Sequence, residues 1–160
     1  MCQSHCSAPS RPRVSGEAGV VGRELECAVL GGRGGARPRA SLPGEIVVTG
    51  EQHDFYDFEA KYLDEAGVEL SCPADLPEHL VERVREIAVR TFEAVGAEGL
   101  SRVDVYGTPD EQVVVNEINT MPGFTPFSMY PRMWEKSGLG YPDLIDELVA
   151  LALERPTGLR

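Results

Sequence analysis

Glu117 and Asn119 stand two residues apart in an apolar stretch, residues 113–125, with the sequence VVVNEINTMPGFT. On a β-strand the side chains at positions i and i+2 share a face, so this carboxylate and this amide oxygen are expected to point the same way. Mg2+ prefers oxygen ligands and is commonly held by one or two carboxylates, with phosphate and water completing its shell. The residue types and their spacing therefore indicate a site for a hard cation such as magnesium.

A third oxygen donor, Asp104, lies upstream in the segment 102–106, RVDVY. Charged and apolar residues alternate there, which places Arg102 and Asp104 on one strand face and the valines on the other. The turn residues GTPD follow, and so short a connection predicts an antiparallel hairpin. If the faces coincide, Asp104, Glu117 and Asn119 converge beside Arg102. The alternative is a solvated polar face on a half-buried sheet, but a strand that ends in this amide–carboxylate pair and then Pro-Gly favours a site.

Several segments resemble the carboxy-terminal part of the D-alanine-D-alanine ligases, which are ATP-grasp enzymes of peptidoglycan synthesis. The resemblance runs from about residue 17 to residue 155 and is most specific in its last third, in the segments GRELECAVLGG, HDFYDFEAKYLD, SRVDVYG, NEINTMPGFTPFSMYPRMW and GYPDLIDELVALALER. It implies an α+β fold, namely the carboxy-terminal portion of an ATP-grasp fold, with a mostly antiparallel sheet and packed helices.

The resemblance also implies roles for the residues of the predicted hairpin. Asp104, Glu117 and Asn119 would hold two Mg2+ (or Mn2+) ions that bridge the phosphates of ATP while the terminal phosphoryl group moves to a substrate carboxylate. The guanidinium fork of Arg102 would bind the acyl phosphate or the tetrahedral intermediate. Gly123 would present a backbone N–H to the developing oxyanion, and its lack of a Cβ would let the substrate approach closely.

The substrate and nucleotide contacts follow from the same resemblance. Ser128 and the backbone of Met129 would bind the carboxylate of the second D-alanine, at the start of a helix that favours an anion. Residues 55–63 correspond to a mobile loop in which Lys61 reaches phosphate and Tyr62 closes the site over the second substrate, and closure excludes water. An intact EAKY segment favours D-alanine over D-lactate as nucleophile.

Two acidic residues near the start of the resemblance match nucleotide contacts of the family. Glu24 matches the acid that hydrogen-bonds the ribose of ATP. Glu17 lies seven residues earlier, at the spacing of the acid at the adenine hinge. The glycine run 31–35 lacks the lysine and the spacing of a Walker loop, so it is predicted to be a flexible turn without a phosphate-binding role.

Two helices are expected to support these residues. One follows Pro77, carries apolar residues at helical spacing and ends at Gly96. The other begins near residue 141, and Trp134 before it is predicted to be buried packing. The last helix is expected to bury one apolar stripe, made of Leu144, Ile145, Leu148, Val149 and Ala152.

Composition excludes some classes of partner. The chain has 160 residues and a formal net charge of −11, which argues against nucleic acid or an anionic membrane, since either calls for a basic patch. No apolar run is long enough to span a membrane and the amino terminus has no signal-peptide core, so a cytoplasmic protein with reduced thiols is expected. Cys2, His5 and Cys6 lack a second ligand cluster, so no metal clip is expected there.

The division into domains leaves the activity of the chain open. Residues 1–16, rich in Ser, Pro and Arg, are predicted to be a disordered leader that matches no part of the ligases; residues 17–155 form a partial ATP-grasp domain and 156–160 a tail. The length excludes the full ligase architecture, so the isolated chain is expected to be inactive or nearly so.

Three functions remain: a D-alanine-D-alanine ligase fragment, another carboxylate–amine ligase of the same fold, or a non-catalytic remnant or interaction module with at most weak magnesium-nucleotide binding. D-alanine is the expected substrate partner. Members of the family are usually homodimers, and self-association of this chain stays open.

Overall fold

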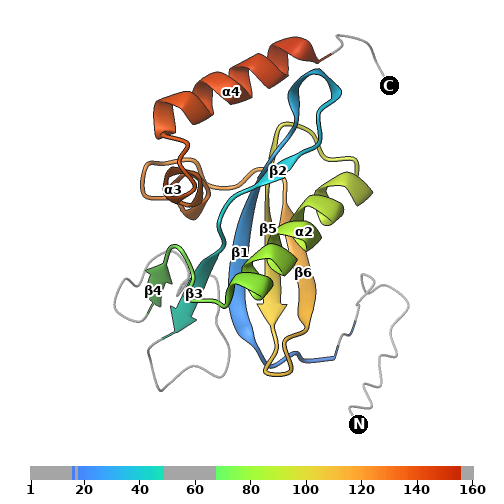
Figure 1. The fold of residues 1–160 in the computed structure, drawn as a ribbon, viewed down its shortest axis with the longest axis vertical. Coiled ribbons are helices and arrows are strands. Elements are labelled where there is room, and N and C mark those ends of the chain that lie inside the picture. The colour runs from blue at the N-terminus through green and yellow to red at the C-terminus, as the bar shows by residue number, and fades with distance from the viewer. Residues whose placement is uncertain (1–15, 17, 49–67, 156–160) are drawn as a thin grey trace, which may run out of the picture.

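A computed structural model of the chain describes residues 16, 18–48 and 68–155. Its centre is one sheet with the strand order β4-β3-β1-β5-β6, and a further strand, β2, pairs with β1 (Figure 1). Every pairing among the described strands is antiparallel, which confirms the mostly antiparallel sheet. The strands are β1 (Arg23–Leu30), β2 (Arg39–Ala40), β3 (Gly44–Val48), β4 (Val68–Ser71), β5 (Leu100–Gly107) and β6 (Val113–Asn119).

Strand β1 is the middle strand of the sheet, and helices cover the sheet on both of its faces. Its residues from Leu25 to Leu30 are all buried. The side chains that point to one face pack with helix α2, and those that point to the other pack with α3 and α4. A strand that is covered on both faces has an almost continuous apolar run, as the sequence CAVL within β1 shows.

Helix α2 (Glu78–Ala94) confirms the predicted helix after Pro77. Pro77 is its N-cap residue, and Gly96 lies just beyond its end with φ of +64°, a backbone conformation that glycine adopts without strain. Val84, Ala88 and Phe92 are buried against the strands. The helix therefore covers one of the two buried faces of the sheet.

Helices α3 (Met129–Lys136) and α4 (Tyr141–Glu154) lie one above the other on the opposite side of the sheet from α2 (Figure 1). Trp134 on α3 is buried, with the Arg39 guanidinium 5.5 Å from its ring centroid, which confirms its packing role. The glycine run before β2 contains a short 3-10 helix, η1 (Arg33–Gly35), rather than an irregular turn.

The predicted apolar stripe of α4 is only partly right. Leu144 is fully buried, and Leu148 and Leu151 pack against the same cluster. Ile145 is 38% exposed and Val149 53% exposed, so these two residues lie off the packed face. The helix presents the i, i+4, i+7 positions that start at Leu144 to the core, and this turns the next positions toward solvent.

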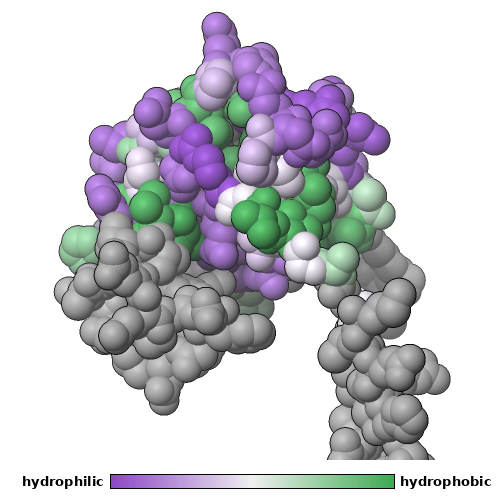
Figure 2. Space-filling view, turned by 90° about the horizontal axis from the view of Figure 1, so that it is seen from below, coloured by the Kyte–Doolittle hydropathy of each residue, from purple (hydrophilic) through white to green (hydrophobic). Residues whose placement is uncertain are grey.

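The described surface is largely hydrophilic on one face. Hydrophilic side chains cover much of the described surface seen from below, and hydrophobic ones gather in patches between them (Figure 2). None of the helices in the described residues is long and apolar enough to cross a membrane. Within the same residues Cys27 and Cys72 are free thiols, as expected, whereas Cys2, His5 and Cys6 lie outside the described residues.

Candidate functional site

The register of β1, β5 and β6 brings three carboxylates into one row. Glu26 on β1 is opposite Asp104 on β5, and Asp104 is opposite Glu117 on β6. Two residues further along the same two strands, Arg102 is opposite Asn119. Directly opposite residues of an antiparallel pair share a face, so these five side chains lie on the same face of the sheet. The register therefore confirms that the predicted strand faces coincide, and the convergence of Asp104, Glu117 and Asn119 on one metal ion stays a prediction.

A β-bulge in β6 makes this arrangement possible. Asp104 is opposite Glu117, but the next residue of β5, Val105, is opposite Val115, so Asn116 is an extra residue without an opposite partner. Val113 packs into the cluster under α2. With strict alternation Glu117 would follow Val113 and Val115 onto that face. The extra residue reverses the alternation and turns Glu117 toward Asp104, which is how bulges re-aim side chains at sites.

Arg102 and Asp104 form a bidentate ion pair. Arg102 donates from Nε to Asp104 Oδ1 at 2.7 Å and from Nη2 to Oδ2 at 2.7 Å. Arg102 Nε also lies 3.2 Å from Glu26 Oε1. Glu26 is only 3% exposed, and sequence reasoning missed it. The signal was present, because Glu24 and Glu26 alternate with apolar residues just as Arg102 and Asp104 do.

The donor set suits a hard cation. Asp104, Glu117 and Asn119 contribute carboxylate and amide oxygens, the ligand type that Mg2+ prefers. Asn119 Oδ1 accepts a hydrogen bond from the backbone N–H of Met121 at 3.0 Å, which holds the amide in place. Among the described residues no three His, Cys, Asp or Glu side chains lie close enough together to hold a metal. The residues fit magnesium by chemistry, and the magnesium site stays a prediction.

Tyr106 shows where the negative charges concentrate. It is opposite Glu24, the predicted ribose contact, on the same sheet face as the carboxylate row. Burial raises the pKa of the Tyr106 phenol, and the negative charges of Glu24, Glu117 and Asp104 raise this pKa further. Three acids thus act on one hydroxyl, and a field of this sign favours a bound cation at this face.

The loop after β6 places two predicted substrate contacts beside each other. Ser128 is the N-cap residue of α3, so the helix starts at Met129 as predicted. Ser128 Oγ accepts a hydrogen bond from the backbone N–H of Thr125 at 3.1 Å and lies 2.9 Å from Thr125 Oγ1. A Cβ on Gly123 would lie 3.1 Å from Ser128 Oγ, closer than nearly all real contacts. A side chain at position 123 would therefore force the Ser128 hydroxyl to move by a few tenths of an ångström.

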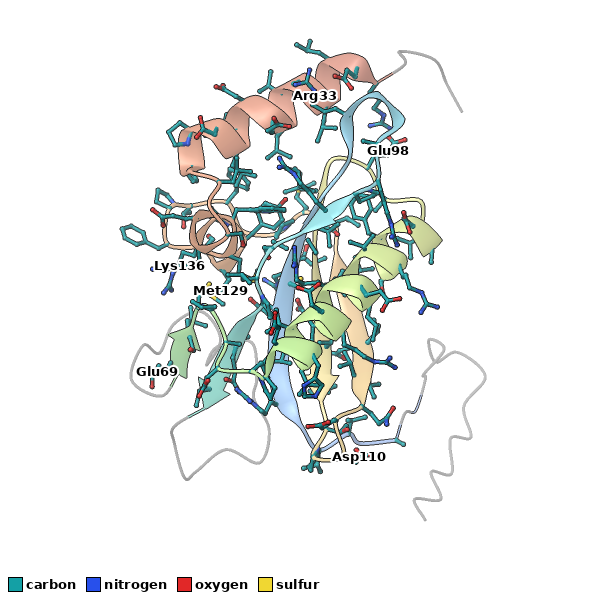
Figure 3. The ribbon with its side chains drawn as sticks, in the orientation of Figure 1. Arg33, Glu69, Glu98, Asp110, Met129 and Lys136 are labelled. Atoms are coloured by element: carbon teal, nitrogen blue, oxygen red, sulfur yellow. The ribbon has the colours of Figure 1, made fainter. Side chains whose placement is uncertain are left out.

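The start of α3 lies next to the carboxylate row. Gly44 on β3 is opposite Glu26, and a Cβ on Gly44 would collide with the Cε atom of Met129. Met129 is seen where α3 meets β3, while Asp110 marks the hairpin turn at the far end of the sheet (Figure 3). Met129, at the start of α3, thus packs over the strand residue that lies opposite Glu26.

Three predicted residues cannot be placed. Glu17, Lys61 and Tyr62 lie outside the described residues, so their roles at the adenine hinge, the phosphate and the second substrate stay predictions. Glu24 is placed on β1 beside Tyr106 and is partly buried.

Comparison with known proteins identifies the family. The family model described as the D-ala D-ala ligase C-terminus matches residues 10–150. The chain belongs to the D-alanine–D-alanine ligase family. The D-alanine–D-alanine ligase of Pseudarthrobacter chlorophenolicus is 67% identical over 144 residues, which are 90% of this chain and 38% of that protein. D-alanine–D-alanine ligase A of Salmonella typhimurium is 50% identical over 88% of this chain and 37% of its own length.

Solved ligase structures have the same fold. The D-alanine-D-alanine ligase of Coxiella burnetii superposes with a TM-score of 0.70 and 44% identity, over 87% of this chain and 34% of the other. The VanG D-Ala:D-Ser ligase of Enterococcus faecalis gives a TM-score of 0.69 and 32% identity, over 83% of this chain and 37% of the other. The chain thus has the fold of the carboxy-terminal part of these ligases and spans well under half of their length.

Proposed function

We propose that this chain supplies the metal-binding and acceptor-binding part of a D-alanine–D-alanine ligase, which joins two D-alanines through an acyl phosphate at the expense of ATP. The observation that carries the proposal is the register that sets Asp104, Glu117, Asn119 and Arg102 on one sheet face. The start of α3 lies next to that face through the contact of Met129 with Gly44. One relative named D-alanine–D-alanine ligase is 67% identical to the chain.

The hairpin residues would act on the phosphates. Asp104, Glu117 and Asn119 would hold Mg2+, which neutralises phosphate charge when bound. The planar fork of Arg102 is paired with Asp104 in this structure. It would turn to a phosphoryl oxygen when the nucleotide binds. A guanidinium forms two parallel hydrogen bonds to a phosphate or carboxylate, which a lysine cannot do.

The loop and the helix start would bind the second D-alanine. Ser128 and the N–H of Met129 lie at the N-terminus of α3, where the helix dipole and the free N–H groups favour a carboxylate. Gly123 lies against Ser128, so its backbone N–H can face the same substrate. By resemblance, Lys61 would reach phosphate, Tyr62 would close the site, and Glu24 and Glu17 would bind the ribose and adenine of ATP.

Two alternatives differ in nucleophile or in catalysis. One solved relative is a D-Ala:D-Ser ligase, at 32% identity. The relatives named D-alanine–D-alanine ligase reach twice that identity, which favours D-alanine as second substrate here. The other alternative is a non-catalytic module.

Because an ATP-consuming ligase acts where ATP is found, the cytoplasm remains the proposed location.

Magnesium-dependent ATP binding to the purified chain tests the proposal. Calorimetry would compare the wild type with Glu117→Gln, which removes one ligand charge, and with Glu86→Gln, an exposed acid on α2 across the sheet. We expect the wild type and Glu86→Gln to bind equally, and Glu117→Gln to bind at least about tenfold more weakly, which corresponds to about 1.4 kcal/mol.

Each other result has a definite meaning. Equal binding by Glu117→Gln would contradict its role as a metal ligand. A folded wild type that binds no ATP would favour the non-catalytic module. D-alanine-dependent phosphate release by the 160 residues alone would contradict the expectation that this stretch is inactive by itself.

A further inference from the structure

Arg102 has two carboxylates within reach of one nitrogen. Its Nε atom lies 2.7 Å from Asp104 Oδ1 and 3.2 Å from Glu26 Oε1. An arginine Nε carries a single hydrogen, so a linear bond to one oxygen leaves the other as a second, weaker acceptor. The shorter contact marks Asp104 as the present acceptor and Glu26 as the second one.

Two partners need the carboxylate oxygens of Asp104 in the proposed function: Arg102 and the metal ion. Both oxygens of Asp104 accept hydrogen bonds from Arg102. The proposed function also requires the Asp104 carboxylate as a metal ligand, and a divalent cation competes directly with a guanidinium for the same oxygens. Binding of the cation would therefore weaken the only bidentate contact that holds Arg102 to this carboxylate, just when Arg102 is needed at the phosphate.

We propose that Glu26 is a positioning residue, which keeps the guanidinium of Arg102 at the site when a cation draws Asp104 away from it. This inference rests on the proposed function of Asp104. The Nε–H of Arg102 then changes acceptor from Asp104 Oδ1 to Glu26 Oε1, while the rest of the guanidinium fork turns to the phosphoryl oxygens.

The position of Glu26 suits a fixed acceptor. It is 3% exposed and lies on β1, the central strand, between Gly44 on β3 and Asp104 on β5. The Cε atom of Met129 fills the space over Gly44 where a side chain would otherwise be, so α3 covers the row on that side. Water competes little for a buried carboxylate on a rigid strand, and this strengthens the attraction between Glu26 and Arg102.

A second buried acid in the fold provides a matched comparison. Glu45 on β3 lies opposite Leu25, which faces α2, and accepts two hydrogen bonds from Arg23, at 2.7 and 2.6 Å. That pair has the bidentate geometry of a structural ion pair. The contact of Glu26 with Arg102 Nε is longer, because the fork of Arg102 is directed at Asp104. Glu26 is thus the more distant of the two carboxylates that lie at Arg102 Nε.

The test follows the Arg102 side chain by NMR of the whole chain, with 15N-labelled arginine. The Nε–H signal of Arg102 is assigned by its loss in Arg102→Lys. Solvent exchange of this hydrogen is measured in the wild type, Asp104→Asn, Glu26→Gln and the double variant, without metal or nucleotide. Glu45→Gln shows the effect of removing a buried acid elsewhere, and backbone amide signals report folding.

The exchange rates of the Arg102 Nε hydrogen should distinguish the contribution of Asp104 from that of Glu26. Asp104→Asn removes the charge of the first acceptor, so Arg102 should keep slow exchange through Glu26. The double variant should exchange at least about tenfold faster, the factor for loss of about one hydrogen bond. Fast exchange in Asp104→Asn alone would overturn the proposal, and so would slow exchange in a folded double variant. Because Asp104→Asn keeps Glu26, a double variant that fails to fold still leaves this decisive comparison.

A titration with Mg2+ and ATP separates this inference from the proposed function. If the wild type binds Mg2+ and ATP, its Arg102 signal should stay slow in exchange and that of Glu26→Gln should become fast. If the wild type binds neither while the exchange pattern above is found, Glu26 holds Arg102 and the proposed metal role of Asp104 is wrong. If binding occurs and Asp104→Asn alone frees Arg102, the metal role survives and the role of Glu26 is wrong.

Discussion

Tyr130→Phe should lower the free energy of unfolding, because its hydroxyl ties helix α3 to the central strand β1. Tyr130 on α3 is 1% exposed and donates a hydrogen bond to the backbone carbonyl of Val29 on β1 at 2.9 Å. Burial raises the pKa of the Tyr130 phenol, so the group stays protonated and a donor. The contact fixes how α3, and with it Ser128, sits over the sheet.

The size of the effect follows from what phenylalanine leaves behind. The ring is kept, so the core loses one oxygen atom and little packing. The net value of the hydrogen bond is about 1 kcal/mol, and a buried acceptor left without this donor costs about 1–3 kcal/mol. A strand carbonyl has a second lone pair that the sheet can use, which favours the lower end. We expect a loss of about 1–1.5 kcal/mol.

Tyr141→Phe is the matched control. Tyr141 donates to the carbonyl of Phe124 at 2.9 Å, but it is only partly buried, so water can replace the lost donor. Its cost should be about 0.5 kcal/mol. Urea unfolding at pH 7 measures both variants, and the midpoint should shift with an unchanged slope. Equal losses for the two variants, or no loss for Tyr130→Phe, would refute the assignment of this hydrogen bond as the tie between α3 and β1.

Three further outcomes follow from buried groups. Burial raises the pKa of the Cys27 thiol to about 12, so the fold holds this proton above pH 9 while the unfolded chain releases it; this thiol should therefore lower stability by about 1.4 kcal/mol per pH unit between roughly pH 9 and 12, and Cys27→Ala should remove that contribution in urea titrations, leaving the fall above pH 10 that buried phenols such as Tyr130 cause. Leu144→Ala should cost about 2–5 kcal/mol and Val149→Ala less than about 0.5, since Leu144 is fully buried and Val149 half exposed. Gly44→Ala should cost about 1–3 kcal/mol in thermal or urea unfolding because the new methyl meets Met129, and an unchanged midpoint would contradict that packing.

The hairpin and its supporting helix could be predicted because their signals are local. The alternation around Arg102 and Asp104 gives the strand, and the four turn residues 107–110 give the antiparallel pairing. The structure adds a hydrogen bond from the backbone N–H of Gln112 to Thr108 Oγ1 at 3.0 Å, which closes the turn. Short-range chemistry of this kind depends on neighbours along the chain, and those are visible in a sequence.

The role of Glu26 could not be predicted, because it depends on a partner far along the chain. Glu26 meets Arg102 only because β1 and β5 pair along their whole length. In a single sequence, an acid within an apolar strand is equally consistent with a solvated edge. The predicted apolar stripe of α4 was partly wrong for a related reason. Leu144 and Val149 are both apolar, and only the place where α3 touches the helix decides which of them is buried.

The position of Glu117 shows how a local rule can give the right partners for an incomplete reason. Side chains at i and i+2 do share a face, so Glu117 and Asn119 belong together. The same rule, extended back along β6, would also put them with Val113, whose side chain packs under α2. The extra residue Asn116 breaks that extension and brings the pair to Asp104. The convergence of acids at this face is therefore set by one unpaired residue, whose position depends on the pairing of two strands and not on the pattern of either one.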